Sequence, residues 1–323
     1  LPSDDELLER SSQGLALTRP ELAVLLSYAK IFIKSELVNS ELYQDSYISQ
    51  AVFGAFPDEL ANRYADALSN HRLRREIIAS QLANGMVDDM GITFVVHLLE
   101  FIGGSVADVA LAYVAFARRF GLSVWIDEIA SQPQVDEDLK LEMLLELIRL
   151  GRRCTRWILR HRHQFGTVED FVASYQPRID ALISERITLS RTMRNDNWQI
   201  EHKELMSAGF GEALALRTAG AAGMVVALPI INVADNTGKD PLEVARVFIG
   251  VSNALGLDWL SEQLGALPSA SHWQAMERDS LSDEVVTQQA TLVGRCFAET
   301  DGDVDSWLAG QQSLVAEWQR VLE

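Results

Sequence analysis

Five arginines at helical spacing in the middle of the chain are the residues whose type and pattern most suggest a chemical role. On a helix they fall within about 100° of the circumference, opposite an apolar face. No acidic residue occurs between Glu146 and Glu169 to neutralise them. A guanidinium group binds a carboxylate at two points, so the pattern predicts a stripe that docks on an acidic surface. The stripe consists of Arg149, Arg152, Arg153, Arg156 and Arg160. The alternative is favourable placement near a helix C-terminus, with pairing to acidic neighbours.

A second basic patch lies nearer the start of the chain and is formed by Arg72, Arg74 and Arg75 beside His71. No acid follows within the patch until Glu76. One acidic surface available to either patch is the chain's own end, since residues 257–323 carry a large excess of acids over bases. We therefore predict that these eight arginines form candidate contacts between domains or subunits.

One glycine-rich segment has the beginning of a dinucleotide-binding turn. That turn requires three glycines, placed directly after a buried strand. Gly209-Phe210-Gly211 supplies two of them, but Leu214 occupies the third position and the preceding residues do not have a strand pattern. The segment is therefore predicted to be a loop at the start of a helix.

Two other groups contain metal-binding residue types in incomplete patterns. The segment 301–305 alternates aspartates as a calcium loop does, but Ser306 and Gln312 occupy the positions of the essential glycine and glutamate. Cys154 and His161 share a helix face without the four ligands of a structural zinc site. We therefore predict no catalytic, cofactor-binding or metal-binding residue in this chain.

Composition limits the classes of protein and partner. The chain has 323 residues, 48% of them hydrophobic, and a net charge of −18. Its negative charge opposes binding to nucleic acid and to anionic membranes, and no apolar run approaches the ~20 residues of a membrane span. The two cysteines fit the reducing cytoplasm. The start, which lacks methionine and a basic segment, suggests the cut end of a longer polypeptide.

The elements that must position these residues are predicted to be helices throughout. Thr18-Arg19-Pro20-Glu21 is a capping box, in which the first and last side chains satisfy each other's backbone N–H groups. Similar caps begin helices over 106–119 and 241–255, and Gly121 and Gly256 end them. Residues 136–163 are predicted to form the longest helix.

Two short apolar runs, 91–96 and 224–227, have the composition of strands. We interpret both as buried helices because each continues to helical length without hairpin turns nearby. Pro229 opposes the second interpretation, since an interior proline breaks or kinks a helix. The predicted fold class is all-α.

A weak internal repeat suggests how the helices are organised. Val109-Ala110 followed by a glycine and Trp125 is echoed about 135 residues later by Val244-Ala245, a glycine and Trp259. Glycine–arginine–cysteine segments at 151–154 and 294–296 repeat in the same order. We predict two duplicated helical blocks, about 71–163 and 206–296, within domains 71–190 and 191–323, after a helical lead-in over 1–70. Reuse of common helix-ending signals is the alternative.

Several segments resemble the large bacterial NAD-specific glutamate dehydrogenases. The resemblance is densest in LTRPELAVLLSYAK at 17–30, HRLRREIIA at 71–79, LAN at 82–84 and GITFV at 91–95. It reappears in TRWILR at 155–160 and GLDWL at 256–260, and so covers most of the chain. In that family these motifs belong to the C-terminal region, downstream of the catalytic core.

The resemblance implies a parent enzyme that deaminates glutamate oxidatively to 2-oxoglutarate and ammonium with NAD. It also implies a cytoplasmic homo-oligomer whose upstream catalytic core is the partner of this region. The family's catalytic lysine and aspartate and its glycine-rich nucleotide turn have no matching positions here, so no catalytic or cofactor residue is carried over. The expected role is structural, oligomerising or regulatory. The alternative function is a free-standing helical adaptor that binds other proteins.

Overall fold

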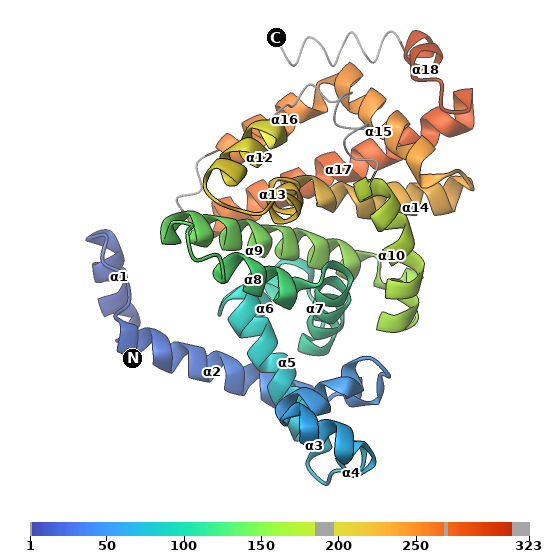
Figure 1. Ribbon diagram of the computed structural model, residues 1–323. Helices are drawn as coiled ribbons and strands as arrows, with labels where there is room; N and C mark the ends of the chain where they lie inside the picture. The colour runs from blue at the N-terminus through green and yellow to red at the C-terminus, as the bar shows by residue number, and fades with distance from the viewer. Residues whose placement is uncertain (1, 185–196, 268–270, 312–323) are drawn as a thin grey trace. The chain divides into compact units, whose positions relative to one another are not determined.

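The computed structural model describes residues 2–184, 197–267 and 271–311, and within these ranges every regular element is a helix (Figure 1). The all-α prediction is therefore confirmed. The chain divides into two compact units. Unit 1 comprises residues 1–123 and 155–172, and unit 2 comprises 124–154 and 173–323. These units group residues by contact rather than by repeat, so the three sequence-based domains and the duplication stay predictions.

Unit 1 is built around α5 and α7. Helix α2 packs along α5, and α7 contacts α2, α5 and α6. The helices are α1 (Asp4–Ser12), α2 (Arg19–Val38), η1 (Leu42–Gln44), η2 (Ile48–Ala55), α3 (Asp58–Arg63), α4 (Ala65–Ser69), α5 (Arg74–Met90), α6 (Phe94–Ile102), α7 (Val106–Phe120) and η3 (Arg162–Gln164). Helix α7 buries ten of its fifteen residues and so forms the centre of this unit's core.

Unit 2 is built around α14, α15 and α17, which all contact one another. Its helices are α8 (Leu122–Ala130), α12 (Asn197–Ser207), α13 (Glu212–Ala219), η4 (Ala222–Val226), α14 (Ala227–Thr237), α15 (Pro241–Leu255), α16 (Leu257–Ala266), α17 (His272–Thr300) and α18 (Val304–Gly310). Two further helices, α9 (Glu137–Arg160) and α10 (Val168–Ser184), are divided between the units, and the first two residues of α8 belong to unit 1.

The helix boundaries follow the capping residues. Thr18 and Ser105 form capping boxes with Glu21 and Asp108, as predicted. Asp240 accepts a hydrogen bond from the backbone N–H of Leu242 and caps α15. Gly121 and Gly256 end α7 and α15 in the left-handed conformation, with φ of 58° and 66°. Glycine adopts this conformation without steric cost, which explains why both helices end there.

The second ambiguous apolar run is helical, and the first is helical from Phe94 onward, after a turn at residues 91–93. Residues 94–102 form α6, and residues 222–237 form η4 followed by α14. Pro229 is tolerated because it lies in the first turn of α14, where a backbone N–H has no intrahelical partner. One prediction is wrong. The longest described helix is α17, with 29 residues, and α9 has 24. The mostly polar sequence of α17 gives a weak periodic signal, although a capping box at Ser271 begins it.

No described helix is by itself long and apolar enough to cross a membrane. Two bent pairs reach that length and apolarity together: Phe94–Ile102 with Val106–Phe120, bent by 113°, and Glu212–Ala219 with Gly223–Thr237, bent by 65°.

Candidate functional site

The arginine stripe of α9 is not one continuous exposed surface. Arg149 is largely exposed and forms an ion pair with Glu146, one turn away on the same helix. Arg152 and Arg153 are half-buried, and Arg160 is exposed. Arg156 is only 2% exposed, which differs from the predicted solvent-facing position. Periodicity placed all five on one side of the helix, but it could not show that the side around Arg156 is covered.

Arg156 and Arg160 are brought together on one aromatic ring in unit 1. Their guanidinium carbons lie 5.1 and 5.3 Å from the ring centroid of Phe101, at the end of α6. A cation over an aromatic face is attracted by the ring quadrupole, and the attraction strengthens when water is excluded. These two arginines therefore connect the end of α9 to α6.

Two aromatic residues next to these arginines, Trp157 and His161, extend the same contact region. Trp157 and His161 stack with ring centroids 4.0 Å apart, and Nδ1 of His161 lies 2.8 Å from the backbone oxygen of Trp157. Desolvation by burial is the main cause that lowers the pKa of His161, and it exceeds the opposing effect of that hydrogen bond. His161 is therefore a packed residue that favours its neutral form.

The second basic patch lies at the start of α5. Arg75 donates a hydrogen bond of 3.4 Å to the backbone oxygen of Ser40, and its guanidinium carbon lies 4.4 Å from the ring centroid of Tyr43. It therefore connects α5 to η1. Arg74 is half-buried, and Arg72 is exposed. Of the three, Arg72 retains the position expected of a residue that binds another surface.

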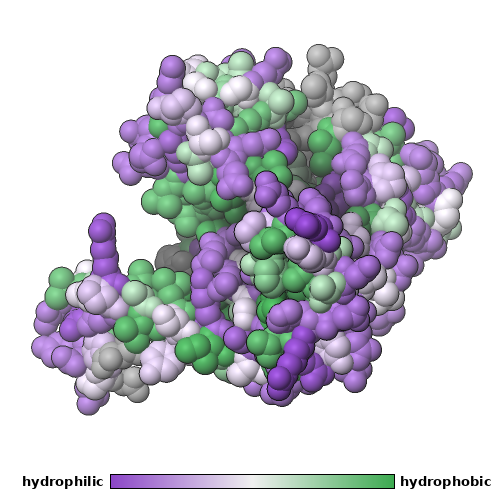
Figure 2. All heavy atoms as spheres, turned by 60° about the horizontal axis from the view of Figure 1, so that its bottom comes forward, coloured by the Kyte–Doolittle hydropathy of each residue, from purple (hydrophilic) through white to green (hydrophobic). Residues whose placement is uncertain are grey.

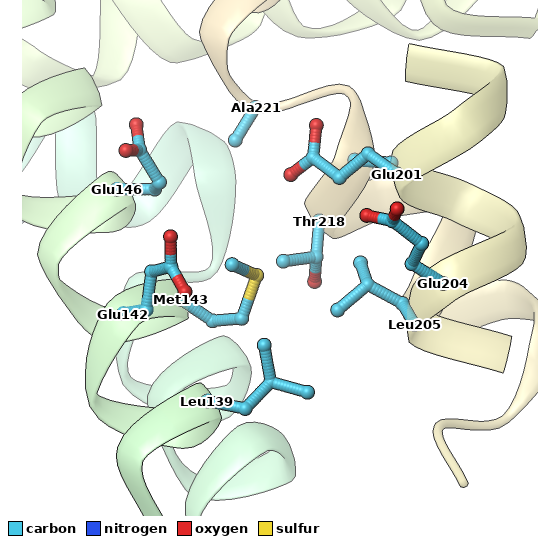
Figure 3. Close-up of a pocket in the computed structure, with 10 residues that line it drawn as sticks. Leu139, Glu142, Met143, Glu146, Glu201, Glu204, Leu205, Thr218 and Ala221 are labelled. Carbon is cyan, nitrogen blue, oxygen red and sulfur yellow. The ribbon is translucent and has the colours of Figure 1, made fainter. Parts of the chain in front are cut away.

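A pocket of about 410 Å³ lies within unit 2 and is lined by four glutamates that sequence reasoning did not single out (Figure 3). Glu142 and Glu146 extend from α9, and Glu201 and Glu204 extend from α12 on the opposite side. Their spacings, i to i+4 and i to i+3, place each pair on one helix face, which is a signal that the sequence contains. Met143, Leu205 and Thr218 form part of the lining between them.

The chemistry of this acidic pocket is limited. Among the described residues, no three His, Cys, Asp or Glu side chains come together in a way that could hold a metal ion. The concentration of negative charge opposes an anionic ligand such as a dinucleotide. Beneath the pocket, Thr218 accepts a hydrogen bond of 3.2 Å from the indole N–H of Trp125, and Arg217 pairs with Glu128 at 2.6 Å. The polar groups around it thus hold helices together.

A smaller pocket, of about 200 Å³, lies within unit 1 between η2, α5 and α7. The phenol of Tyr113 donates a hydrogen bond of 2.5 Å to Asp89. Burial, together with the negative charge of Asp89, raises the pKa of Tyr113 far above its ordinary value, so the phenol stays protonated. A Cβ on Gly85 would lie 3.0 Å from the Tyr113 oxygen, which explains why this helix position is a glycine.

The incomplete motifs have structural roles. Asp301 pairs with Lys239, and Asp303 caps α18 by accepting a hydrogen bond from the backbone N–H of Ser306. Gly211 precedes the first turn of α13, as the prediction of a helix-start loop requires. Cys154 and Cys296 are both buried and form no disulfide. Asp301 and Asp303 of the incomplete calcium motif are thus used for a contact between segments and for a helix cap.

Comparison with known proteins gives a consistent result. The family model described as "Glutamate dehydrogenase, C-terminal" matches residues 14–323. The chain is 40% identical over 329 residues to the NAD-specific glutamate dehydrogenase of Pseudomonas aeruginosa and 37% identical over 330 residues to that of Halomonas elongata. Identity to the enzyme of the same name from Mycobacterium tuberculosis is 29% over 333 residues. Each alignment covers 100% of this chain and 20% of the relative, so the chain spans about a fifth of their length.

Proposed function

Because the chain belongs to the family of glutamate dehydrogenase C-terminal regions, we propose that it is the C-terminal helical region of a large NAD-dependent glutamate dehydrogenase. The proposed reaction of the whole enzyme is oxidative deamination of L-glutamate to 2-oxoglutarate and ammonium, with hydride transfer to NAD. The observation that carries this proposal is the alignment of the entire chain with NAD-specific glutamate dehydrogenases. It favours this function over that of a free-standing adaptor.

Within that enzyme we assign this region a structural, oligomerising or regulatory role. Hydride transfer requires a phosphate-binding turn at a strand–helix junction and a positioned acid or base. The larger pocket described above presents carboxylates, which repel a pyrophosphate, and the Tyr113–Asp89 pair connects helices. We therefore assign catalysis and NAD binding to the polypeptide that the relatives possess outside the matched fifth.

We also propose that docking through arginines is limited to Arg72 and Arg149, the exposed members of the two basic sets, since Arg160 lies on the ring of Phe101. Arg75 and Arg156 are engaged inside unit 1 and contribute to its folding. A cytoplasmic homo-oligomer remains our proposal for the whole enzyme. The buried thiols of Cys154 and Cys296, which form no disulfide, are compatible with a reducing compartment.

The proposal is tested with the whole polypeptide and with the 323-residue chain side by side. We expect the whole polypeptide to reduce NAD in the presence of L-glutamate, followed by the absorbance of NADH. Calorimetry of the 323-residue chain with NAD is expected to show no binding. A whole polypeptide without glutamate-dependent activity would overturn the parent assignment. Micromolar NAD binding by the 323-residue chain would overturn the non-catalytic role.

A further inference from the structure

Helix α2 carries an uncovered apolar stripe. Val24, Tyr28, Ile31 and Phe32 occur at i, i+4, i+7 and i+8, which places them on one face of the helix. Their side chains are 42%, 62%, 62% and 44% exposed. Figure 2 shows hydrophobic side chains at the surface of the part of unit 1 at the left of the view, where Figure 1 places α1 and the first turns of α2. We call these four residues the α2 stripe.

The stripe is a second apolar face, separate from the one that anchors α2. Of the twenty residues of α2, only Ile33 and Leu37 are buried, and they belong to the side that packs on α5. At about 100° per residue, Ile33 lies roughly 160° around the helix from Ile31 and roughly 140° from Tyr28. Contiguous exposed apolar side chains of this kind mark surfaces that bind another protein segment.

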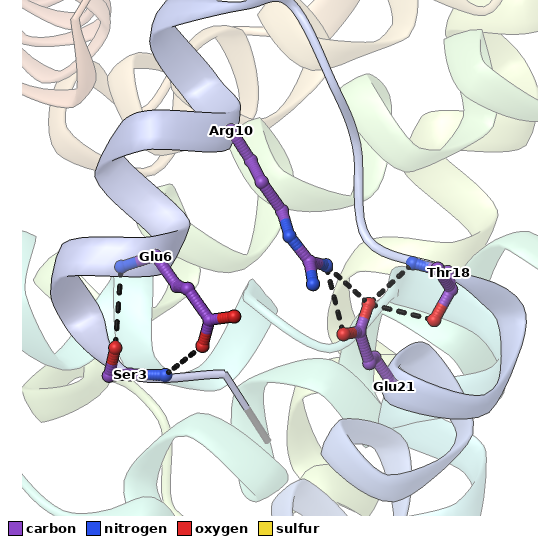
Figure 4. A network of polar contacts seen from close by, with 5 residues as sticks. All are labelled: Ser3, Glu6, Arg10, Thr18 and Glu21. Atoms are coloured by element: carbon purple, nitrogen blue, oxygen red, sulfur yellow. Dashed lines mark hydrogen bonds and ion pairs between the residues drawn. The ribbon is translucent and has the colours of Figure 1, made fainter.

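Polar contacts connect α2 to α1 and to α5, which restricts the motion of the helix that carries the stripe. The carboxylate of Glu21 accepts hydrogen bonds from the backbone N–H and the hydroxyl of Thr18 at 2.8 and 2.7 Å (Figure 4). Arg10 of α1 donates to both oxygens of the same carboxylate at 2.9 and 3.0 Å. Farther along, Lys30 pairs with Asp88 of α5 at 2.7 Å. A preorganised surface loses less conformational entropy on binding.

We infer that the α2 stripe binds polypeptide that lies outside these 323 residues in the same enzyme, an inference that rests on the proposed function. The matched family is a C-terminal one, and four-fifths of each relative lies outside the matched region. Upstream polypeptide would be joined to the same chain that carries α2, near the N-terminal end of the unit. A tethered partner has an effective concentration in the millimolar range, so a small apolar contact gains occupancy that it would not have with a separate molecule.

A second copy of this chain fits the stripe less well. Each copy carries a net charge of −18, so two copies repel each other. A stable interface between separate molecules also buries about 800 Å² per partner, which is more than two or three turns of one helix face supply. The upstream polypeptide is therefore the occupant to which we commit.

The direct test is photo-crosslinking in the whole polypeptide. The photoreactive residue p-benzoylphenylalanine replaces Tyr28, and mass spectrometry identifies the linked peptides. We expect links to residues upstream of this region within one polypeptide. The matched control places the same group at Ala23, which is exposed on α2 but outside the stripe. Links within the 323 residues, links between two copies, or a yield no higher than that of the control would each overturn the inference.

A second measurement uses charged substitutions. Ile31→Glu in the whole polypeptide is expected to raise the hydrogen-exchange rate of α2 amides at least tenfold, because it breaks the contact. Ala23→Glu, which adds the same charge outside the stripe, is expected to leave that rate unchanged. In the 323-residue chain, Ile31→Glu should not alter the helical circular dichroism, since Ile31 is already exposed there. Equal exchange in Ile31→Glu and Ala23→Glu would overturn the inference.

These outcomes are separable from the proposed function. Crosslinks from Tyr28 to upstream residues in a polypeptide that lacks glutamate-dependent activity would leave the docking surface in place and overturn the parent reaction. Glutamate dehydrogenase activity without those crosslinks would leave the parent reaction in place and overturn the docking surface.

Discussion

Helices α2 and α7 begin in the same way, but most of α7 is buried and most of α2 is not. Each starts with a capping box whose acid also pairs with a distant arginine, Glu21 with Arg10 and Asp108 with Arg162. Helix α7 then buries ten of fifteen residues, whereas α2 buries two of twenty although it is rich in large apolar side chains. Caps and composition therefore determine where a helix forms, whereas neighbouring elements determine which of its faces are covered.

The largest expected effect separates the two helices directly. Phe116→Ala in α7 removes a ring that is completely buried, and we expect it to lower the free energy of unfolding of unit 1 by about 3–5 kcal/mol. Phe32→Ala in the α2 stripe is expected to cost less than about 1 kcal/mol in the 323-residue chain, because this side chain is already 44% exposed. Urea denaturation of the two variants checks both values. Equal destabilisation by the two substitutions would contradict the difference in burial between α7 and the α2 stripe.

Buried and exposed side chains also alternate along α9. Arg156→Glu places a negative charge in a buried position on Phe101 and is expected to cost about 3 kcal/mol. Arg149→Glu removes only an exposed ion pair with Glu146 and is expected to cost less than about 1 kcal/mol. Thermal unfolding of the two variants measures the difference. A stable Arg156→Glu protein would return that residue to the set of docking candidates.

The repeated helix endings allow a smaller effect to be compared between the two units. Gly121→Ala and Gly256→Ala each place a Cβ on a residue with φ near +60°, which costs about 1–2 kcal/mol. Because both glycines end fifteen-residue helices that are followed directly by another helix, we expect similar losses in the two units. Denaturant midpoints of the two variants test this. A large difference would weaken the proposed duplication.

The smallest expected effect concerns the start of α2. The backbone N–H of Thr18, then its hydroxyl, and Arg10 lower the pKa of Glu21 to about 2, from an ordinary value of 4.5. A carboxyl whose pKa is lowered by folding stabilises the folded state above its unfolded pKa and loses that contribution as pH falls through the folded value. The contacts of α1 with α2 should therefore weaken between about pH 4.5 and 2. NMR titration of Glu21 measures this, and Glu21→Gln is expected to abolish the transition.

Much of the fold could be predicted because its signals are local. Capping boxes at Thr18 and Ser105 and the terminal glycines at 121 and 256 act within one helical turn, and the structure has them as predicted. The length of α17 was missed because its apolar residues are sparse and its stability depends on packing against α14, α15 and α16. The candidate arginines could be identified from residue type and spacing, but the sequence did not show which of them are buried.

The fold class, the ends of the main helices and membership of the glutamate dehydrogenase C-terminal family can all be inferred from the linear sequence. Hydrogen bonds between residues three or four apart determine helix ends, so a linear pattern contains them. The burial of Arg156 and the exposure of the α2 stripe are visible only in the three-dimensional structure. That structure also brought Glu142 and Glu146 to face Glu201 and Glu204 across one pocket. These properties depend on contacts between segments far apart in the chain, and helical periodicity carries no information about which segment covers which face.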